Sequence, residues 1–114
     1  MDTRSKIVDA VPSEARRGKA VLGYFDPMHA GHVRRLRELS GPGGRLTIVV
    51  ADPPEPILPA RARAELVAGL ECVAYVLAGE AAVEGLPDVV DERQADSLRS
   101  REFAQYVLAR HNAR

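Results

Sequence analysis

The sequence has one cysteine, no tryptophan and no excess of charge of either sign. A single thiol, Cys72, excludes an internal disulfide and cannot form a structural zinc site alone, so we interpret it as a buried apolar side chain. Sixteen basic and sixteen acidic side chains cancel, which removes the charge excess typical of general nucleic-acid or anionic-membrane binders. We find neither an apolar signal segment nor a run of about eighteen apolar residues. These absences predict a cytoplasmic protein that binds small ligands, with no nucleic acid and no membrane as partners.

The length of 114 residues leaves room for one domain with a small core. We expect this single domain to span residues 1–114, with residues 1–18 as a packed N-terminal arm. Within the arm, Ser13 is placed to cap a helical turn over residues 14–17. Lys19 stands just before the first apolar run, where it either contacts a phosphate or is ordinary solvated surface.

Short apolar runs alternate with helical patterns along the rest of the chain. The strands are predicted at residues 20–22, 45–51, 73–78 and 86–90. The helices are predicted at residues 33–39, 60–71 and 96–110. The order indicates an α/β fold, a small Rossmann-like parallel sheet of four or five strands with helices on both faces. The proline-rich residues 52–59 should form a stiff loop at the carboxyl edge of the sheet.

Helical spacing also predicts which side chains of the later helices are buried. In the helix over residues 60–71 they are Leu66, Val67 and Leu70. In the final helix they are Phe103, Ala104, Val107 and Leu108.

Residues 23–32, GYFDPMHAGH, lie between the first predicted strand and the helical pattern that follows it. Gly23 and Gly31 let the backbone approach a ligand closely, and Pro27 stiffens the turn. Asp26 sits where a carboxylate can cap the next helix or hold a metal.

The two histidines of this stretch, His29 and His32, are three residues apart. If the helix begins near Met28, both imidazoles lie on one side of its first turn, beside free backbone N–H groups. The positive end of the helix dipole favours an anion there. The pattern therefore predicts a phosphate site.

The sequence Gly-x-Phe-Asp-Pro-x-His-x-Gly-His resembles the signature of the HxGH nucleotidyltransferase superfamily, which is cytidylyltransferase-like. The nearest types are the heptose-phosphate adenylyltransferases and the glycerol-phosphate cytidylyltransferases. Residues 63–73 resemble the family's Arg-x-x-x-Leu-x-x-Leu-x-x-Val-Asp helix, with Ala74 in place of the final Asp. Residues 97–101 are a loose echo of its Ile-Ser-Ser-Thr-x-x-Arg motif. The family's Lys-Gly element after the fourth strand is missing.

The resemblance implies an enzyme that transfers a nucleoside monophosphate from CTP or ATP to a small phosphorylated acceptor, such as a sugar- or polyol-phosphate, and releases pyrophosphate. It implies that the catalytic residues are His29 and His32. The implied nucleotide-binding residues are Gly23, Tyr24, Phe25, Asp26, Gly31, Ser97 and Arg101. The implied contacts to the acceptor or to phosphates are Lys19, Arg61, Arg63 and Arg99. Mg²⁺ would accompany the triphosphate without protein ligands, and the chain would form a homodimer.

Two other classes stay open. One is a catalytically degenerate nucleotide-binding or regulatory module on the same fold, which the missing Lys-Gly element and the loose closing motif favour. The other is an interaction domain whose apolar surface pairs with another subunit. The closing motif also has a simpler interpretation, in which Asp96 or Ser97 caps the final helix and the arginines face solvent.

Overall fold

In the described part of the chain, four parallel strands form the sheet. The computed structural model describes residues 2–112, and its strands stand in the order β3-β2-β1-β4. Their bounds are Ala20–Gly23 for β1, Leu46–Val50 for β2, Val73–Ala78 for β3 and Val89–Asp91 for β4. The predicted α/β class with a parallel Rossmann-like sheet is confirmed. The fourth strand begins three residues later than predicted, and Pro87, which has no N–H for a ladder, precedes it.

The strand order reverses beside β1. In register, Val21 lies opposite Ile48 of β2 on one side and Val90 of β4 on the other. The chain moves outward from β1 to β2 and β3, then returns to place β4 on the free side of β1. In open α/β sheets ligands bind at the carboxyl ends of the strands at such a switch point. The residues that follow β1 therefore lie at the expected ligand edge.

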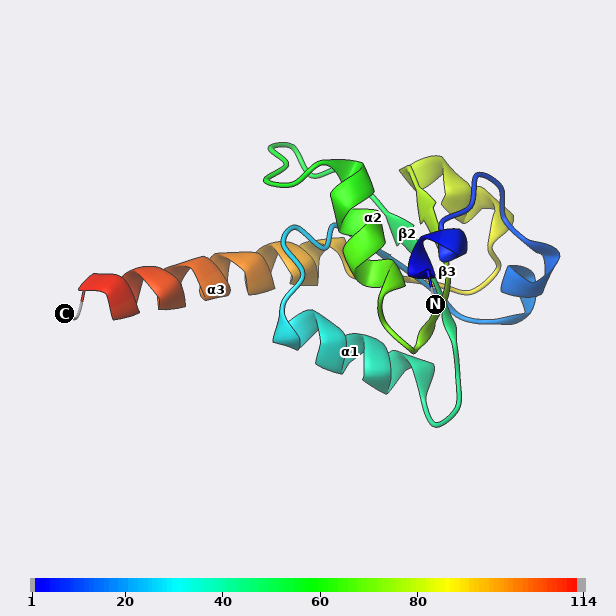
Figure 1. Ribbon diagram of the computed structural model, residues 1–114, viewed down its shortest axis with the longest axis horizontal. Coiled ribbons are helices and arrows are strands. Elements are labelled where there is room, and N and C mark those ends of the chain that lie inside the picture. Colours follow the sequence, from blue (N-terminus) through cyan, green and yellow to red (C-terminus); the bar gives the residue numbers. More distant parts are fainter. Residues whose placement is uncertain (1, 113–114) are drawn as a thin grey trace.

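Helices cover both faces of the sheet, but they differ in kind between the faces. The helices α1 (Ala30–Ser40) and α2 (Ala60–Ala68) cover one face (Figure 1). That layer contains Val21, Ile48, Leu36 and Val67. The other face is covered by the short 3-10 helices η2 (Ser13–Arg17) and η3 (Glu80–Gly85). Its core residues include Ala15, Leu22, Val49 and Leu86.

The N-terminal arm packs against the outer strand of the sheet. It contains a further 3-10 turn, η1 (Thr3–Lys6), followed by a parallel bridge between Ile7 and Val76. The predicted cap at Ser13 is wrong, because η2 begins at Ser13 and Pro12 precedes it with no side-chain cap.

The helix α2 ends at Ala68, earlier than predicted, and Gly69 is its C-cap. Val67 is fully buried as predicted, whereas Leu66 is exposed and Leu70 is half-buried. A nine-residue helix presents a narrow stripe to the sheet, and Leu66 falls outside it. Cys72 is half-buried rather than buried, and partial burial raises the pKa of its thiol.

The last helix, α3 (Arg93–Asn112), begins three residues before the predicted start and runs away from the rest of the domain (Figure 1). It gives the molecule principal extents of 52 × 30 × 28 Å. Val107 and Leu108 are 48% and 61% exposed, so their predicted burial is wrong. Helical spacing identifies an apolar stripe but not whether another element covers it. The predicted burial of Phe103 and Ala104 lies outside the described side chains.

None of the helices described between residues 2 and 112 has the length and apolar content needed to cross a membrane.

Candidate active site

The loop after β1 brings the signature residues to the switch point. Phe25 has a left-handed backbone (φ 50°) and a buried ring that lies 5.8 Å from the ring of His32, centroid to centroid. The helix α1 begins at Ala30, earlier than the predicted pattern over residues 33–39, and His29 is its N-cap. The loop thus reverses direction and presents the first turn of α1 to the carboxyl end of β1.

The two imidazoles occupy the start of α1 as a pair. The Nδ1 atom of His29 accepts a hydrogen bond from the Gly31 N–H (3.1 Å), and the Nδ1 atom of His32 accepts one from the His29 N–H (3.2 Å). The ring centroids are 4.3 Å apart. Because each Nδ1 accepts, the hydrogen of each neutral ring sits on Nε2. Each Nε2 atom can therefore donate to an acceptor such as a phosphate oxygen.

Burial and then the neighbouring His32 ring lower the pKa of His29 below its ordinary value. A lowered pKa keeps the imidazole uncharged near neutral pH. The ring then acts as a neutral hydrogen-bond donor rather than as a cation.

Asp26 does not cap α1. Its two carboxylate oxygens accept from the Ile57 N–H (2.7 Å) and the Leu58 N–H (2.8 Å), and the residue is 7% exposed. The predicted helix cap is therefore wrong, since the side chain of His29 holds that position. Asp26 instead joins the signature loop to the proline-rich loop 52–59.

Arg63 makes a second connection between the same loops. Its buried guanidinium donates to the carbonyls of Leu58 (3.0 Å), Tyr24 (3.1 Å) and Ala51 (2.7 Å) and to the carboxylate of Asp52 (2.6 Å). The side chain is 1% exposed. These contacts make Arg63 a positioning residue that holds three backbone segments together, and they direct its donors inward.

Asp96, on the first turns of α3, reaches into the signature loop. Its Oδ2 atom accepts from the Tyr24 N–H (2.9 Å) and the Phe25 N–H (3.4 Å). Its Oδ1 atom lies 3.1 Å from Nε2 of His32 and accepts from Nη1 of Arg99 (3.0 Å). Asp96 is 2% exposed. One carboxylate thus contacts four of the groups at the site.

Gly23 makes room for this carboxylate. A methyl group at Gly23 would overlap Oδ2 of Asp96 and would lie 2.9 Å from the Phe25 ring. The need for glycine here is therefore steric and comes from the chain itself.

Glu92 joins α3 to α1. Its carboxylate accepts from Nε of Arg35 (2.7 Å) and Nη2 of Arg99 (3.2 Å), and the residue is 8% exposed. Neither Glu92 nor the central position of Asp96 was predicted from the sequence. The available signal was two acids, Glu92 and Asp96, among the arginines at the start of the final helix.

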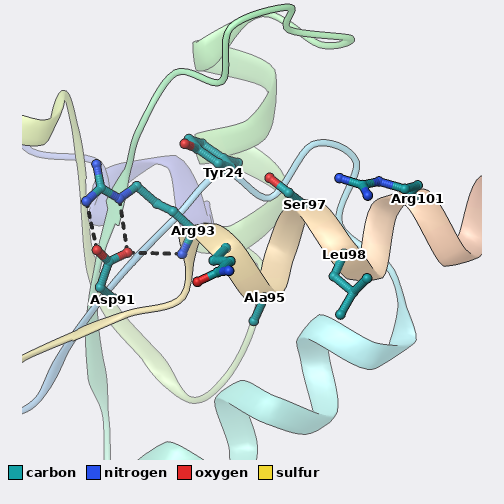
Figure 2. A pocket seen from close by; sticks show the side chains of 8 residues that line it. Tyr24, Asp91, Arg93, Ala95, Ser97, Leu98 and Arg101 are labelled. Atoms are coloured by element: carbon teal, nitrogen blue, oxygen red, sulfur yellow. Dashed lines mark hydrogen bonds and ion pairs between the residues drawn. The ribbon is translucent and has the colours of Figure 1, made fainter.

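Two hollows flank α3 at this edge. The Tyr24 hollow, shown in Figure 2, has a volume of about 860 Å³ and is lined by Tyr24, Asp91, Arg93, Ser97, Leu98 and Arg101. Tyr24, Ser97 and Arg101 lie along one side of α3, and Leu98 lies along the other. The His29 hollow has a volume of about 560 Å³ and is lined by His29, Gly31, Arg34, Arg35, Arg99 and Glu102. Both volumes are in the range of small-ligand sites.

The remaining predicted phosphate contacts are not brought together with this site. Lys19 precedes β1 at the amino edge of the sheet, where its carbonyl accepts from the Thr47 N–H. Arg61 is exposed on the first turn of α2 and pairs with Glu65 (3.2 Å). Ser97 and Arg101, by contrast, are exposed and line the Tyr24 hollow.

The parallel sheet and the HxGH-type turn at its switch point are typical of cytidylyltransferase-like proteins. A comparison with known families agrees. Residues 20–111 match the cytidylyltransferase-like family. The chain belongs to this family.

Relatives of known name are similar over part of their length. The bifunctional protein HldE of Chromohalobacter salexigens is 36% identical over 104 residues, which cover 75% of this chain and 22% of that protein. The FAD synthase of Halomicrobium mukohataei is 40% identical over 65 residues, which cover 52% of this chain and 46% of that protein. The FAD synthase of Halorhabdus utahensis is 40% identical over 65 residues, 50% of this chain and 44% of that protein. The chain therefore spans about a fifth of the first relative and under half of the other two.

Proposed function

We propose that this domain is a nucleotidyltransferase that moves a nucleoside monophosphate from CTP or ATP to a small phosphorylated acceptor. The observation that carries the proposal is the cluster of hydrogen-bond donors at the switch point. It consists of the backbone N–H groups of Tyr24 and Phe25 and the Nε2 atoms of His29 and His32. Donors at a helix start and at the end of a parallel strand suit a phosphorylated ligand.

In the proposed reaction, a phosphate oxygen of the acceptor attacks the α-phosphorus of the triphosphate. A new P–O bond forms, the bond from the α-phosphorus to the bridging oxygen breaks, and pyrophosphate leaves with the electron pair. No covalent intermediate on the protein is needed. The chain contributes position and charge stabilisation, because the fixed donors are in place before negative charge develops on the phosphate oxygens.

Mg²⁺ suits this site as part of the substrate. Among the residues that the structure describes, no three His, Cys, Asp or Glu side chains are grouped so as to hold a metal ion. The groups at the switch point are mainly N–H donors, which suit phosphate oxygens and not a cation. Mg²⁺ prefers water and phosphate oxygens as ligands and would neutralise part of the triphosphate charge. We therefore propose that it enters bound to the nucleotide.

The acceptor class rests on the resemblance and on the relatives. The sugar- and polyol-phosphate types remain the first candidates. The FAD synthase relatives add a flavin phosphate. The Tyr24 hollow contains the aromatic ring, hydroxyl and guanidinium groups of Tyr24, Ser97 and Arg101, and the His29 hollow contains Arg34 and Arg35. We assign the nucleotide to the Tyr24 hollow and the acceptor to the His29 hollow. Both ligands would then share the hydrogen-bond donors at the switch point.

The test is turnover, measured as pyrophosphate release from CTP or ATP with Mg²⁺ and a panel of phosphorylated acceptors. Replacing His29 with Ala, or His32 with Asn, should lower turnover about a hundredfold to a thousandfold, the usual loss for one charge-stabilising donor. Asn is chosen at buried His32 because its carbonyl can still accept from the His29 N–H. The control is His111→Ala, outside the signature, and thermal unfolding checks that all variants fold. Equal turnover in all four proteins would remove the two imidazoles from the mechanism.

A binding module without catalysis is the second candidate. It is favoured by the contacts of Arg63 and Arg99 within the chain. Arg63 donates to the Tyr24 carbonyl and the Asp52 carboxylate, and Arg99 donates to two carboxylates of its own segment. Calorimetric nucleotide binding with no pyrophosphate release for any acceptor would select this module.

We also propose a homodimer, because Tyr106, Val107 and Leu108 are exposed on α3. Sedimentation equilibrium tests it, and a monomer at all concentrations would refute it.

A further inference from the structure

The carboxylate of Asp96 occupies a position with the chemistry of a phosphate-binding site. It is 2% exposed, and two backbone N–H groups, one imidazole and one guanidinium surround it. Backbone N–H groups and cationic side chains of this kind also bind phosphate groups at helix starts. The groups around the Asp96 carboxylate could therefore bind a phosphate in its place.

Three of these four groups are also donors that the proposed function requires for the triphosphate. Tyr24, Phe25 and His32 would each have to donate to a phosphate oxygen, yet each now faces Asp96. A second anion within a few ångströms of a buried carboxylate is strongly repelled, because the interior screens charge poorly. Asp96 and a phosphate therefore cannot use these donors together.

The position of Asp96 depends on the first turns of α3. Beyond Asp96, the described contacts of this helix with the body include Arg99, which pairs with Glu92. Farther along, Arg101, Glu102 and the described side chains of residues 105–109 are all exposed. Exposed positions are typical of segments that move at low cost, so the described side chains of this part of α3 favour a movement at the base of the helix.

We propose that Asp96 is an internal competitor for the phosphate site, and that binding of a nucleoside triphosphate displaces its carboxylate and shifts the base of α3. This inference rests on the proposed function, since it names the atoms at which that same site receives a phosphate. Nucleotide binds only to molecules in which the Asp96 carboxylate is withdrawn, which we call the open state. The apparent affinity is therefore the affinity of the open state multiplied by the fraction of molecules in that state.

The first experiment measures nucleotide binding by calorimetry in wild type and in Asp96→Asn, with ATP and CTP in the presence of Mg²⁺. Asn keeps the size of the side chain but removes its charge, so we expect affinity to rise about tenfold, the gain when the open state grows from a tenth of the population to most of it. Glu84→Gln is the matched control, because it removes an exposed carboxylate on η3 that lines neither hollow. Its affinity should stay within about twofold of wild type, since an exposed charge is well screened.

The outcomes separate this inference from the proposed function. Wild-type turnover together with unchanged or weaker binding in Asp96→Asn would overturn the competition and make Asp96 a support of the loop. An equal gain in Glu84→Gln would show that the effect comes from net charge alone, which would also overturn the competition. No binding and no turnover in any protein would refute both claims.

A second measurement does not depend on changing Asp96. Spin labels at positions 84 and 109, both exposed, report the distance between the body and α3 in a Cys72→Ser background. Saturating triphosphate with Mg²⁺ should shift the distance distribution measured by electron-electron resonance. An identical distribution with and without bound nucleotide would refute the displacement of α3.

Discussion

Replacing Arg63 with Met should be the most damaging single change to the stability of the two loops at the site. The guanidinium donates to three carbonyls and one carboxylate, and the side chain is 1% exposed. Met keeps the approximate length of the side chain but leaves the carbonyls of Ala51, Tyr24 and Leu58 without their donor. A buried carbonyl left without its donor typically costs about 1–3 kcal/mol, so with three such carbonyls we expect a loss of about 3 kcal/mol or more.

Only part of this loss comes from the ion pair. Asp52 is 69% exposed on its side chain, so Asp52→Asn should cost no more than about 1 kcal/mol. The comparison of the two variants separates the backbone contacts of Arg63 from its salt bridge. Arg63→Lys should lie between them, because an ammonium group cannot reproduce the forked geometry of a guanidinium.

The assay is urea unfolding followed by far-ultraviolet circular dichroism, since the chain has no tryptophan for fluorescence. The midpoint should fall while the slope stays constant, as for a change in stability alone. A loss below about 1 kcal/mol in Arg63→Met would refute the reasoning, because the carbonyls would then be satisfied without it.

Two further changes test the site from other directions. The lowered pKa of His29 means that the unfolded chain binds a proton more readily than the folded one, so stability should fall as pH decreases below the unfolded value of about 6.5. Urea midpoints of wild type and His29→Gln between about pH 5 and 7.5 should diverge in that direction, and parallel curves would contradict it. Gly23→Ala should cost about 1–3 kcal/mol from overlap with Asp96. In an Asp96→Ser background the same change should cost less, and equal costs in the two backgrounds would show that Asp96 is not the obstacle.

The part of the fold that follows from local pattern was predictable from the sequence. The strands β1, β2 and β3 were recognised because they are short apolar runs bounded by glycine and proline, and β3 was placed at its observed bounds. The exposure of Leu66, Val107 and Leu108 was not predictable, because it depends on which elements pack against a helix and not on the helix itself.

The candidate site divides in the same way. The pairing of His29 and His32 followed from their spacing at a helix start. The contacts of Asp96 with Tyr24 and Phe25 join residues more than 70 positions apart, and single-sequence patterns carry no information on such pairs. The inward direction of Arg63 escaped prediction for the same reason, since a buried arginine and an exposed one look alike in a sequence.

The outward course of α3 has a mechanical consequence. From Asp96 to Asn112 the helix advances by sixteen residue steps, which at roughly 1.5 Å per step is about 24 Å. A tilt of about 10° around Asp96 would carry the far end through about 4 Å, because the helix is stiff over that length. A small movement of the Asp96 side chain thereby becomes a severalfold larger movement at the carboxyl-terminal end of α3. The helix is in effect a lever whose short arm lies among the histidines and whose long arm lies in solvent.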